Sequence, residues 1–399
     1  MGIVLMVNFA IFSCNGPMTV LFSIRSGGQF GFIDATGRIV IEPKLQNDRF
    51  YSHYEGAVDF RDWVPVKQDK SWGYIDRRGK FVIPPKFSMV DPFSEDLAAF
   101  GEPLGRSYGI TNFKWGYIDR RGDIRIAARF GWAMEFCQGL AAVALPDLDG
   151  EFSRWFAEWA LIDPRGNIVQ RGFQSLFPLK ENRWLARKEG LWGYLDSVGS
   201  ELIPYQFDHA YKFVDGRARV VQGGRHAIID CDGKILFCCQ ATDPLPQYSW
   251  ARQDYIFMLN EGLTLDFCND KWGFLDSQGK VAVDYAYDDA AAFYQGLAAV
   301  KVGKKWGYVD KRGQMVIAPT FEEASEFHEG RAHAKVKVKQ GGKMVTRYGF
   351  IDTTGAMVIE PQFSKTDERP VCFQFGLAAV VKEKRRQYIN VNGDVVWEE

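Results

Sequence analysis

Residues 71–85 read SWGYIDRRGKFVIPP, and residues 114–126 read KWGYIDRRGDIRI, a near copy that begins 43 residues further on. A phrase that occurs twice can be a catalytic motif, a metal-binding loop or a structural unit. The rest of the chain distinguishes these, because related phrases recur from one end to the other. We therefore interpret the phrase as a building block.

The repeat is marked by an aspartate and by a glycine three residues after it. A second phrase, such as FCQGLAAV at 136–143 or FYQGLAAV at 293–300, follows the copies. Successive aspartates are 33 to 46 residues apart, which indicates one tandem array. The ten positions are Asp34, Asp76, Asp119, Asp163, Asp196, Asp230, Asp276, Asp310 and Asp352, with Asn390 in the last copy.

Each part of the phrase has a structural explanation. The stretches 72–75 and 81–83 are rich in residues that favour strands. Between them, Asp76 can accept hydrogen bonds from the backbone of the turn, and Gly79 can adopt a positive φ. A proline lacks the N–H that a strand ladder needs, so the pair at 84–85 ends the second strand. The sequence predicts a type I turn closed by a glycine bulge, followed by a third strand of the Leu-Ala-Ala type.

Three short strands cannot bury a core alone, so each unit must stack on its neighbours. We expect an all-β tandem repeat array over residues 18–399, made of about ten three-stranded antiparallel units in an open, curved or superhelical form. The alternative is a closed, β-propeller-like ring, in which the N-terminal strand TVLFSI at 19–24 completes the last unit. The units start near residues 30, 72, 115, 159, 192, 226, 272, 306, 348 and 386.

The array resembles the WG-repeat family, which is named after its Trp-Gly dipeptide, over about residues 19–397. The resemblance implies a repeat architecture and no particular chemistry. Five copies depart from the pattern. Phe30-Gly31 and Tyr348-Gly349 replace the tryptophan with another aromatic residue, Trp159-Ala160 loses the glycine, and His226-Ala227 and Arg386-Gln387 lose both residues. A terminal copy faces water on one side and can diverge for that reason. The internal copy at His226 is either a decayed repeat or a place where the scaffold was relaxed for binding.

Composition narrows the class of protein. A net charge of −1 argues against an overall attraction to nucleic acid or anionic membranes. The seven cysteines include no CxxC pair, so we predict reduced thiols rather than a disulfide framework or a structural zinc site. Residues 1–17 carry an apolar run with no preceding Lys or Arg, and the run is too short to span a bilayer. We interpret it as a leader or an untemplated N-terminal segment, and we expect a cytoplasmic protein, with an envelope or secreted location as the alternative.

Catalytic chemistry has no signature in the sequence. The repeated aspartates offer one carboxylate per turn, unlike calcium loops, in which oxygen ligands alternate. The histidines form no HExxH motif, and neither GxSxG nor a Walker loop occurs. We therefore predict no catalytic residue, no metal site and no cofactor, and we expect a protein that is not an enzyme.

The turns between the first two strands of each unit provide the best candidate for a binding surface. In a regular array they line one edge, and several carry cations on consecutive units. The sequence predicts an edge that binds an anion or an acidic partner, with a protein as the expected partner, although solvated turn residues would look the same. Exposed aromatic side chains that bind a glycan or the cell envelope are the alternative, and the insertions at 101–113, 144–157 and 238–265 are a second candidate surface. The basic residues of the strip are Arg77, Arg78, Arg120, Arg121, Arg165, Lys311 and Arg312.

Overall fold

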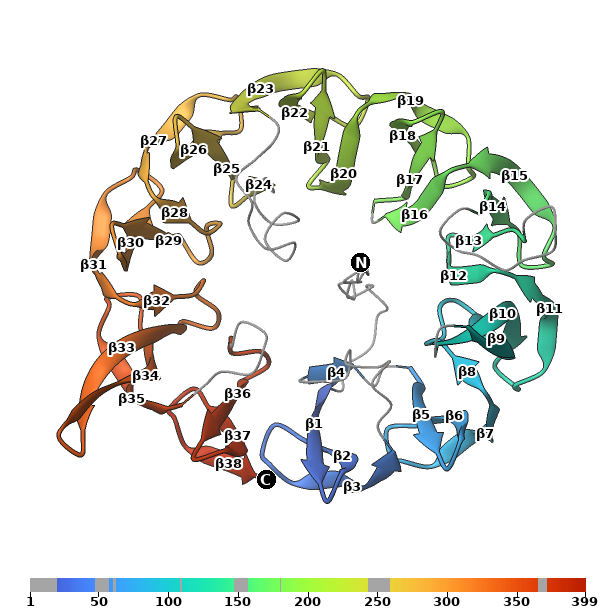
Figure 1. Cartoon of the computed structure of the whole chain (residues 1–399), viewed down its shortest axis with the longest axis horizontal. Helices are drawn as coiled ribbons and strands as arrows, with labels where there is room; N and C mark the ends of the chain where they lie inside the picture. Colours follow the sequence, from blue (N-terminus) through green and yellow to red (C-terminus); the bar gives the residue numbers. More distant parts are fainter. Residues whose placement is uncertain are drawn as a thin grey trace.

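The computed structural model describes residues 20–46, 57–59, 62–107, 110–146, 157–179, 181–242, 259–364 and 372–399. The leader predicted at 1–17 lies outside these residues. In the described ranges the secondary structure consists of strands, without a helix. The strands form small antiparallel sheets, here called blades 1 to 10, which stand side by side around a ring (Figure 1).

The first five blades are given from the innermost strand to the outermost. Blade 1 contains β4 (Ala57–Asp59), β1 (Val20–Ser26), β2 (Gln29–Ile33) and β3 (Ile39–Gln46), and blade 2 contains β5 (Val64–Gln68), β6 (Ser71–Ile75) and β7 (Phe81–Phe87). Blade 3 contains β8 (Met89–Val90), β9 (Leu97–Ser107), β10 (Ile110–Asp119) and β11 (Ile124–Phe130). Blade 4 contains β12 (Trp132–Cys137), β13 (Leu140–Ala144), β14 (Trp159–Ile162) and β15 (Ile168–Phe173), and blade 5 contains β16 (Ser175–Leu179), β17 (Arg183–Lys188), β18 (Leu191–Leu195) and β19 (Glu201–Phe207).

The other five blades follow in the same order. Blade 6 contains β20 (His209–Val214), β21 (Arg217–Gln222), β22 (Arg225–Ile229) and β23 (Ile235–Thr242), and blade 7 contains β24 (Leu259–Asn260), β25 (Leu263–Cys268), β26 (Lys271–Asp276) and β27 (Val281–Tyr287). Blade 8 contains β28 (Asp289–Ala290), β29 (Leu297–Val302), β30 (Lys305–Asp310) and β31 (Met315–Phe321). Blade 9 contains β32 (Glu323–Ala324), β33 (Ala332–Gln340), β34 (Lys343–Ile351) and β35 (Met357–Phe363), and blade 10 contains β36 (Leu377–Lys382), β37 (Arg385–Asn390) and β38 (Val395–Glu398).

The all-β repeat array is confirmed, but the predicted three-stranded unit is wrong for most blades. Blades 3 to 9 are four-stranded, and blades 1 and 2 join into one seven-stranded sheet through a pairing of Gln46 with Lys67. The fourth strand is the innermost, and it is as short as Met89–Val90, too short to recognise from its composition. The Leu-Ala-Ala strand pairs with the Trp-Gly strand that follows it, as β9 does with β10, rather than with the preceding hairpin.

The predicted hairpin turn is present in all ten copies. In blade 2 the backbone N–H of Gly79 donates to the carbonyl oxygen of Asp76 at 2.9 Å, and Gly79 has a φ of +75°. The Asp76 side chain also accepts from the backbone N–H groups of Arg78 at 2.9 Å and Lys80 at 3.0 Å. In the last copy, Asn390 uses its side-chain oxygen in the same way. The invariant aspartate or asparagine is therefore explained by the turn.

The glycine of the Trp-Gly dipeptide is required by a bulge in the outer strand. In blade 2, Trp72 pairs with Phe87 and Tyr74 pairs with Ile83. Between these two pairs the outer strand advances by four residues, whereas the inner strand advances by two. The extra residues bring the outer backbone over Gly73, where an added Cβ would lie 2.5 Å from the carbonyl oxygen of Ile83. Seven blades have this glycine and the same close approach of a backbone carbonyl oxygen: Gly31, Gly73, Gly116, Gly193, Gly273, Gly307 and Gly349.

Blade 4 shows what happens when the glycine is lost. Ala160 pairs directly with Arg171, and the outer strand β15 has six residues instead of the seven in β7. Ala227 and Gln387 likewise pair with single residues of their outer strands, Cys238 and Glu398. The alanine or glutamine is tolerated because it has a paired partner on the outer strand, and the register shifts of blades 4 and 6 lie just before this position instead of over it.

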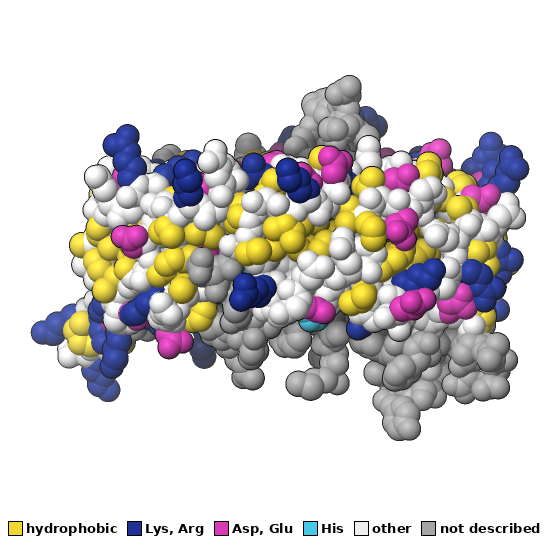
Figure 2. Space-filling model, turned by 90° about the horizontal axis from the view of Figure 1, so that it is seen from above, with side chains coloured by type: hydrophobic (Ala, Val, Ile, Leu, Met, Phe, Trp, Pro, Cys, Tyr) yellow, Lys and Arg dark blue, Asp and Glu magenta, His cyan; other side chains and the backbone are white. Residues whose placement is uncertain are grey.

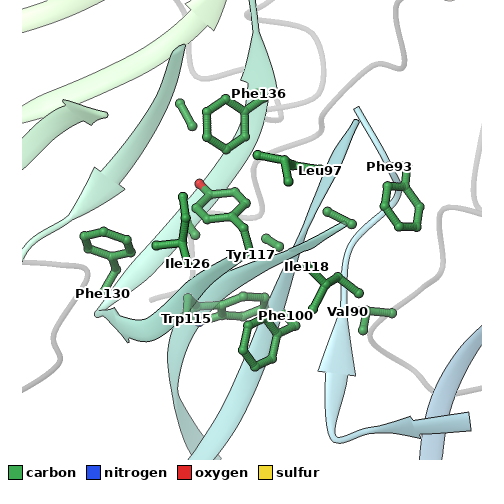
Figure 3. Packing of buried hydrophobic residues seen from close by; sticks show 14 of the residues in the cluster. Val90, Phe93, Leu97, Phe100, Trp115, Tyr117, Ile118, Ile126, Phe130 and Phe136 are labelled. Atoms are coloured by element: carbon green, nitrogen blue, oxygen red, sulfur yellow. The ribbon is translucent and has the colours of Figure 1, made fainter. Parts of the chain in front are cut away.

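Aromatic contacts join most blades to the next. Tyr117 in blade 3 lies 4.8 Å from Phe136 in blade 4, between ring centroids, and its hydroxyl donates to the carbonyl oxygen of Met134 at 2.7 Å (Figure 3). The core around them extends from Trp72 to Ile162 and so crosses three blades. Four of the five Trp-Gly tryptophans are buried, namely Trp72, Trp115, Trp272 and Trp306, whereas Trp192 is only partly buried. The residue after the glycine makes most of the blade-to-blade ring contacts, and Trp115 adds one to Trp132 of blade 4, with ring centroids 5.1 Å apart.

The expectation of an open array is wrong, because the first and last blades are in contact. The hydroxyl of Tyr388 donates to the carbonyl oxygen of Ser23 at 2.8 Å, and its ring lies 5.6 Å from that of Phe22. The structure therefore has the ring form (Figure 1), although β1 pairs with β2 and β4 and does not complete blade 10. The number of repeats is visible in the sequence, whereas the rotation from one blade to the next, which decides closure, is not.

The rim of the ring carries an apolar band. Figure 2 shows hydrophobic side chains in a continuous zone on the visible face, with many of the charged side chains above and below it. These side chains come from the outer strands, where Ile124 is 55% exposed and Val281 is 50% exposed. They alternate with residues that face the neighbouring blade, as expected for strands with one buried face.

We expect Gly73→Ala to lower the free energy of unfolding by about 1–3 kcal/mol, because the new Cβ must displace the backbone of β7. Ala160→Gly is the matched control and should cost about 1–2 kcal/mol, from lost strand propensity and the lost burial of one methyl group, with no displacement of β15. Urea unfolding followed by circular dichroism gives both values. Equal stability of Gly73→Ala and the wild type would contradict the bulge argument.

Ring closure can be tested with one hydroxyl group. Tyr388→Phe should lose about 1 kcal/mol of stability, as should the matched variant Tyr117→Phe, because both remove a hydrogen bond to a carbonyl oxygen of the following blade. In an open array only Tyr117→Phe would be destabilised. Thermal unfolding of the two variants separates these cases, and an unaffected Tyr388→Phe would rule out the closed ring.

Candidate functional site

The basic strip lies on turns whose backbone is held in a fixed conformation. In blade 3, the side chain of Asp119 accepts from the backbone N–H groups of Arg121 at 2.8 Å and Asp123 at 3.0 Å. The same geometry in blades 2 and 4 leaves Arg77, Arg78 and Arg165 exposed at the tips of their turns. These turns therefore present cations at sites that are ordered before any partner binds.

Hydrogen bonds at the turns lower the pKa of the aspartates that accept them. The backbone N–H groups of Lys280 and Gln278 lower the pKa of Asp276. In Asp352 the hydroxyl of Thr354 is the main cause of a lowered pKa. These carboxylates stay ionised in the folded protein, so the turns keep their hydrogen bonds at neutral pH.

Arg120 was predicted to belong to the strip, but the structure gives it a different role. Its guanidinium donates two hydrogen bonds to the carboxylate of Asp62, at 2.7 and 2.8 Å, and it lies over the rings of Trp63 and Phe93 at 5.5 and 5.0 Å. The hydrogen bond to Asp62 raises the pKa of Arg120. Arg120 therefore fastens the segment at 62–63 to blade 3.

Lys311 is also paired, since its ammonium group lies 3.1 Å from the carboxylate of Glu261 and donates to the Glu261 carbonyl oxygen at 3.0 Å. Arg312 stands exposed on the same turn, in blade 8. Of the seven residues predicted for the strip, four exposed arginines remain on the consecutive blades 2 to 4, and Arg312 is exposed on the distant blade 8. We call the group on blades 2 to 4 the arginine strip: Arg77, Arg78, Arg121 and Arg165.

A second ring of turns, between the innermost strand and its neighbour, was missed by sequence reasoning. Here a carboxylate or amide of one blade accepts a hydrogen bond from a glycine N–H of the next blade. Glu95 accepts from Gly139 at 3.1 Å, Glu261 from Gly296 at 3.0 Å, and Glu329 from Gly376 at 2.9 Å. The signal was a Glu or Gln two residues before the second strand of the blade, as in Gln138-Gly139-Leu140 and Glu261-Gly262-Leu263. The hydrogen bond that it makes fixes the spacing of adjacent turns.

The divergent copy in blade 6 keeps its four strands and contains a buried polar pair. Arg219 Nε donates to His226 Nδ1 at 2.8 Å, and the two side chains are 4% and 1% exposed. The Arg219 guanidinium also lies 4.8 Å from the ring centroid of Tyr211. Blade 6 therefore replaces the usual tryptophan with a satisfied polar contact, and both interpretations of this copy remain predictions.

The three insertions, which form the second candidate surface, are only partly described by the structure. The insertion at 101–113 contributes to the long hairpin β9–β10, whereas 144–157 and 238–265 fall largely outside the described residues. Within the ranges that the structure describes, no group of three or more His, Cys, Asp or Glu side chains is placed to hold a metal ion. The same ranges include no helix long and apolar enough to cross a membrane.

The fold and the turns define a ring of tandem β-repeats that carries a rigid basic strip. The family model "WG containing repeat" matches residues 30–70, 72–101, 115–145, 192–225, 272–306, 306–343 and 348–384, together more than half of the chain. The chain belongs to the WG-repeat family. The seven matches begin at the starts of the copies that retain the glycine, and the three unmatched copies are those that have lost it.

Comparison with solved structures and curated proteins adds no functional argument. A crystal structure titled as the eukaryotic initiation factor shares 11% identity, with 96% of each chain covered and a TM-score of 0.44. Apo AztD from Citrobacter koseri shares 12% identity over 75% of this chain and 93% of that chain, with a TM-score of 0.32. Both scores are too low to support a conclusion, and no curated protein matches the sequence.

The role of Arg120 can be measured by a double-mutant cycle with Asp62. We expect Arg120→Ala and Asp62→Ala to be coupled by about 1 kcal/mol, because the pair is bidentate but partly open to solvent. Urea unfolding of the wild type, both single variants and the double variant gives the coupling energy. A coupling near zero would show that Arg120 does not fasten this segment and would return it to the strip.

Proposed function

We propose that the protein is a non-catalytic scaffold that binds another protein through the arginine strip. The observation that carries the proposal is the exposure of Arg77, Arg78, Arg121 and Arg165 on rigid turns of three consecutive blades. Guanidinium groups form bidentate hydrogen bonds with carboxylates, so the expected partner presents an acidic surface. A preformed backbone lowers the entropy lost on binding.

A protein partner is favoured over a glycan by the distribution of aromatic side chains. Sugars bind well to exposed aromatic rings. Among the described residues, however, Phe375 is the one aromatic residue that is well exposed, at 43%. The remaining tryptophans, tyrosines and phenylalanines of those ranges are buried or half-buried. The proposal of a non-catalytic role rests on the absence of catalytic motifs from the sequence.

Affinity capture at low salt tests the strip. The variant Arg77→Glu, Arg78→Glu, Arg121→Glu, Arg165→Glu should lose the proteins that the wild type enriches, because like charges would now repel an acidic partner. The control reverses four exposed lysines elsewhere and should retain those proteins: Lys70→Glu, Lys188→Glu, Lys234→Glu and Lys304→Glu.

Quantitative mass spectrometry of the captured proteins gives the readout, and raised salt should reduce capture by the wild type. Enrichment of the same proteins by the strip variant and the wild type would remove the strip from the proposal. Equal loss in the control variant would show a general effect of net charge instead.

A further inference from the structure

The hairpin β33–β34 in blade 9 is longer than its equivalent in the neighbouring blade. Its strands have nine residues each, against six each in β29 and β30 of blade 8. Figure 1 shows the hairpin extending outward beyond the rim of the ring. Its pairing continues from the base through Val336–Arg347 and Lys339–Met344 to the tip.

The outer part of this hairpin is a two-stranded ribbon with open edges. On one side β32 reaches only to Lys335, and on the other side β35 reaches only to Tyr348. Within the described residues, no strand pairs with 336–340 or 343–347 except the two strands of the hairpin themselves. Open edges present backbone groups that can accept a further strand.

The ribbon is strongly cationic within a chain of net charge −1. No Asp or Glu occurs between Ala332 and Ile351. Carboxylates of β32 and the residue before it reach only the lower part of the hairpin, where Lys335 lies 2.8 Å from Glu323 and Lys337 lies 3.4 Å from Glu322. The cations of the hairpin are Lys335, Lys337, Lys339, Lys343 and Arg347.

The two faces of the ribbon have different chemistry. Alternate residues of a strand point to opposite faces, so 335, 337 and 339 place lysines on one face about 6.8 Å apart. The other face carries Val336 and Val338 from β33 and Val345 from β34, all half-exposed, and at its margins Arg347, opposite Val336, and Lys343, opposite Gln340. The ribbon is held together across its strands by a hydrogen bond from Arg347 Nη2 to Gln340 Oε1 at 2.6 Å.

We propose that the outer part of β33–β34 is a docking arm that binds an extended, acidic segment of a partner protein as a third strand. The segment alternates acidic and apolar residues, because its acidic side chains would then meet the lysine face while its apolar ones meet the valine face. A second copy of this chain does not fit, since two lysine-rich edges repel each other. The arm is a surface separate from the arginine strip, because the tip of the hairpin and the turn at Asp352 lie at opposite ends of β34.

The experiment measures binding of a synthetic peptide that alternates glutamate and valine, carries a fluorescent label and is followed by anisotropy at low salt. A peptide of the same composition, with its glutamates and valines in two separate blocks, is the comparison. We expect the full-length protein to bind the alternating peptide at least about tenfold more tightly than the block peptide, because only the first matches both faces.

Two variants of the full chain locate the binding. The first deletes 336–339 and 344–347, which leaves Lys335-Gln340-Gly341-Gly342-Lys343-Tyr348, a hairpin of the length that blade 6 forms at 221–226. The second is Lys339→Glu with Lys343→Glu, which keeps the length. Each should weaken binding at least about tenfold. The control Lys70→Glu with Lys304→Glu, and the strip variant Arg77→Glu with Arg78→Glu, should bind as the wild type does.

Several results would overturn the proposal. Equal binding of the alternating and block peptides would reduce the arm to a general electrostatic surface. Unchanged binding by the shortened hairpin would place the peptide elsewhere, and if that variant does not fold, unchanged binding by Lys339→Glu with Lys343→Glu decides against the arm. Tighter binding of single-stranded DNA or anionic lipid vesicles through the same lysines would replace the acidic protein segment as the occupant.

Discussion

The ring depends on a close contact between the turn glycine of each blade and the preceding blade. An added Cβ on Gly122 would lie 2.9 Å from the side chain of Ile83, and one on Gly355 would lie 2.8 Å from Ile317. At the seam, a Cβ on Gly37 would meet the backbone carbonyl oxygen of Val396. No larger residue could bring the blades this close, and the left-handed backbone of the turn also favours glycine. One residue therefore sets both the turn and the distance between blades.

The bulge of the outer strand explains why the repeat tolerates some changes and not others. Where Gly73 faces the backbone of β7, the two strands constrain each other. In blade 4 the inner glycine and one outer residue are lost together, so the blade keeps its pairing through Ala160 and Arg171. The divergent copies are thus alternative solutions to the same packing problem, and the ring remains continuous across them.

The two proposed surfaces differ in how they acquire their chemistry. The arginine strip consists of single residues placed at the tips of turns that the scaffold already needs. The docking arm is an extension of one blade, in which the strand period separates Lys337 and Lys339 from Val338. In both, a rigid array supplies the position and a small number of variable residues supplies the charge.

The sequence by itself determined the number of repeats, the all-β class, the Asp76–Gly79 turn and the need for stacking, because these depend on local backbone preferences and on a period in the chain. It did not reveal the two-residue strand Met89–Val90, which forms only when a neighbouring strand is present to pair with it. From the sequence, Arg120 and Lys311 were assigned to the strip, because their partners Asp62 and Glu261 are distant in sequence and the pairing could not be recognised. Ring closure was decided only by the tertiary structure, because it depends on the sum of ten rotations between blades, and no single repeat encodes that sum.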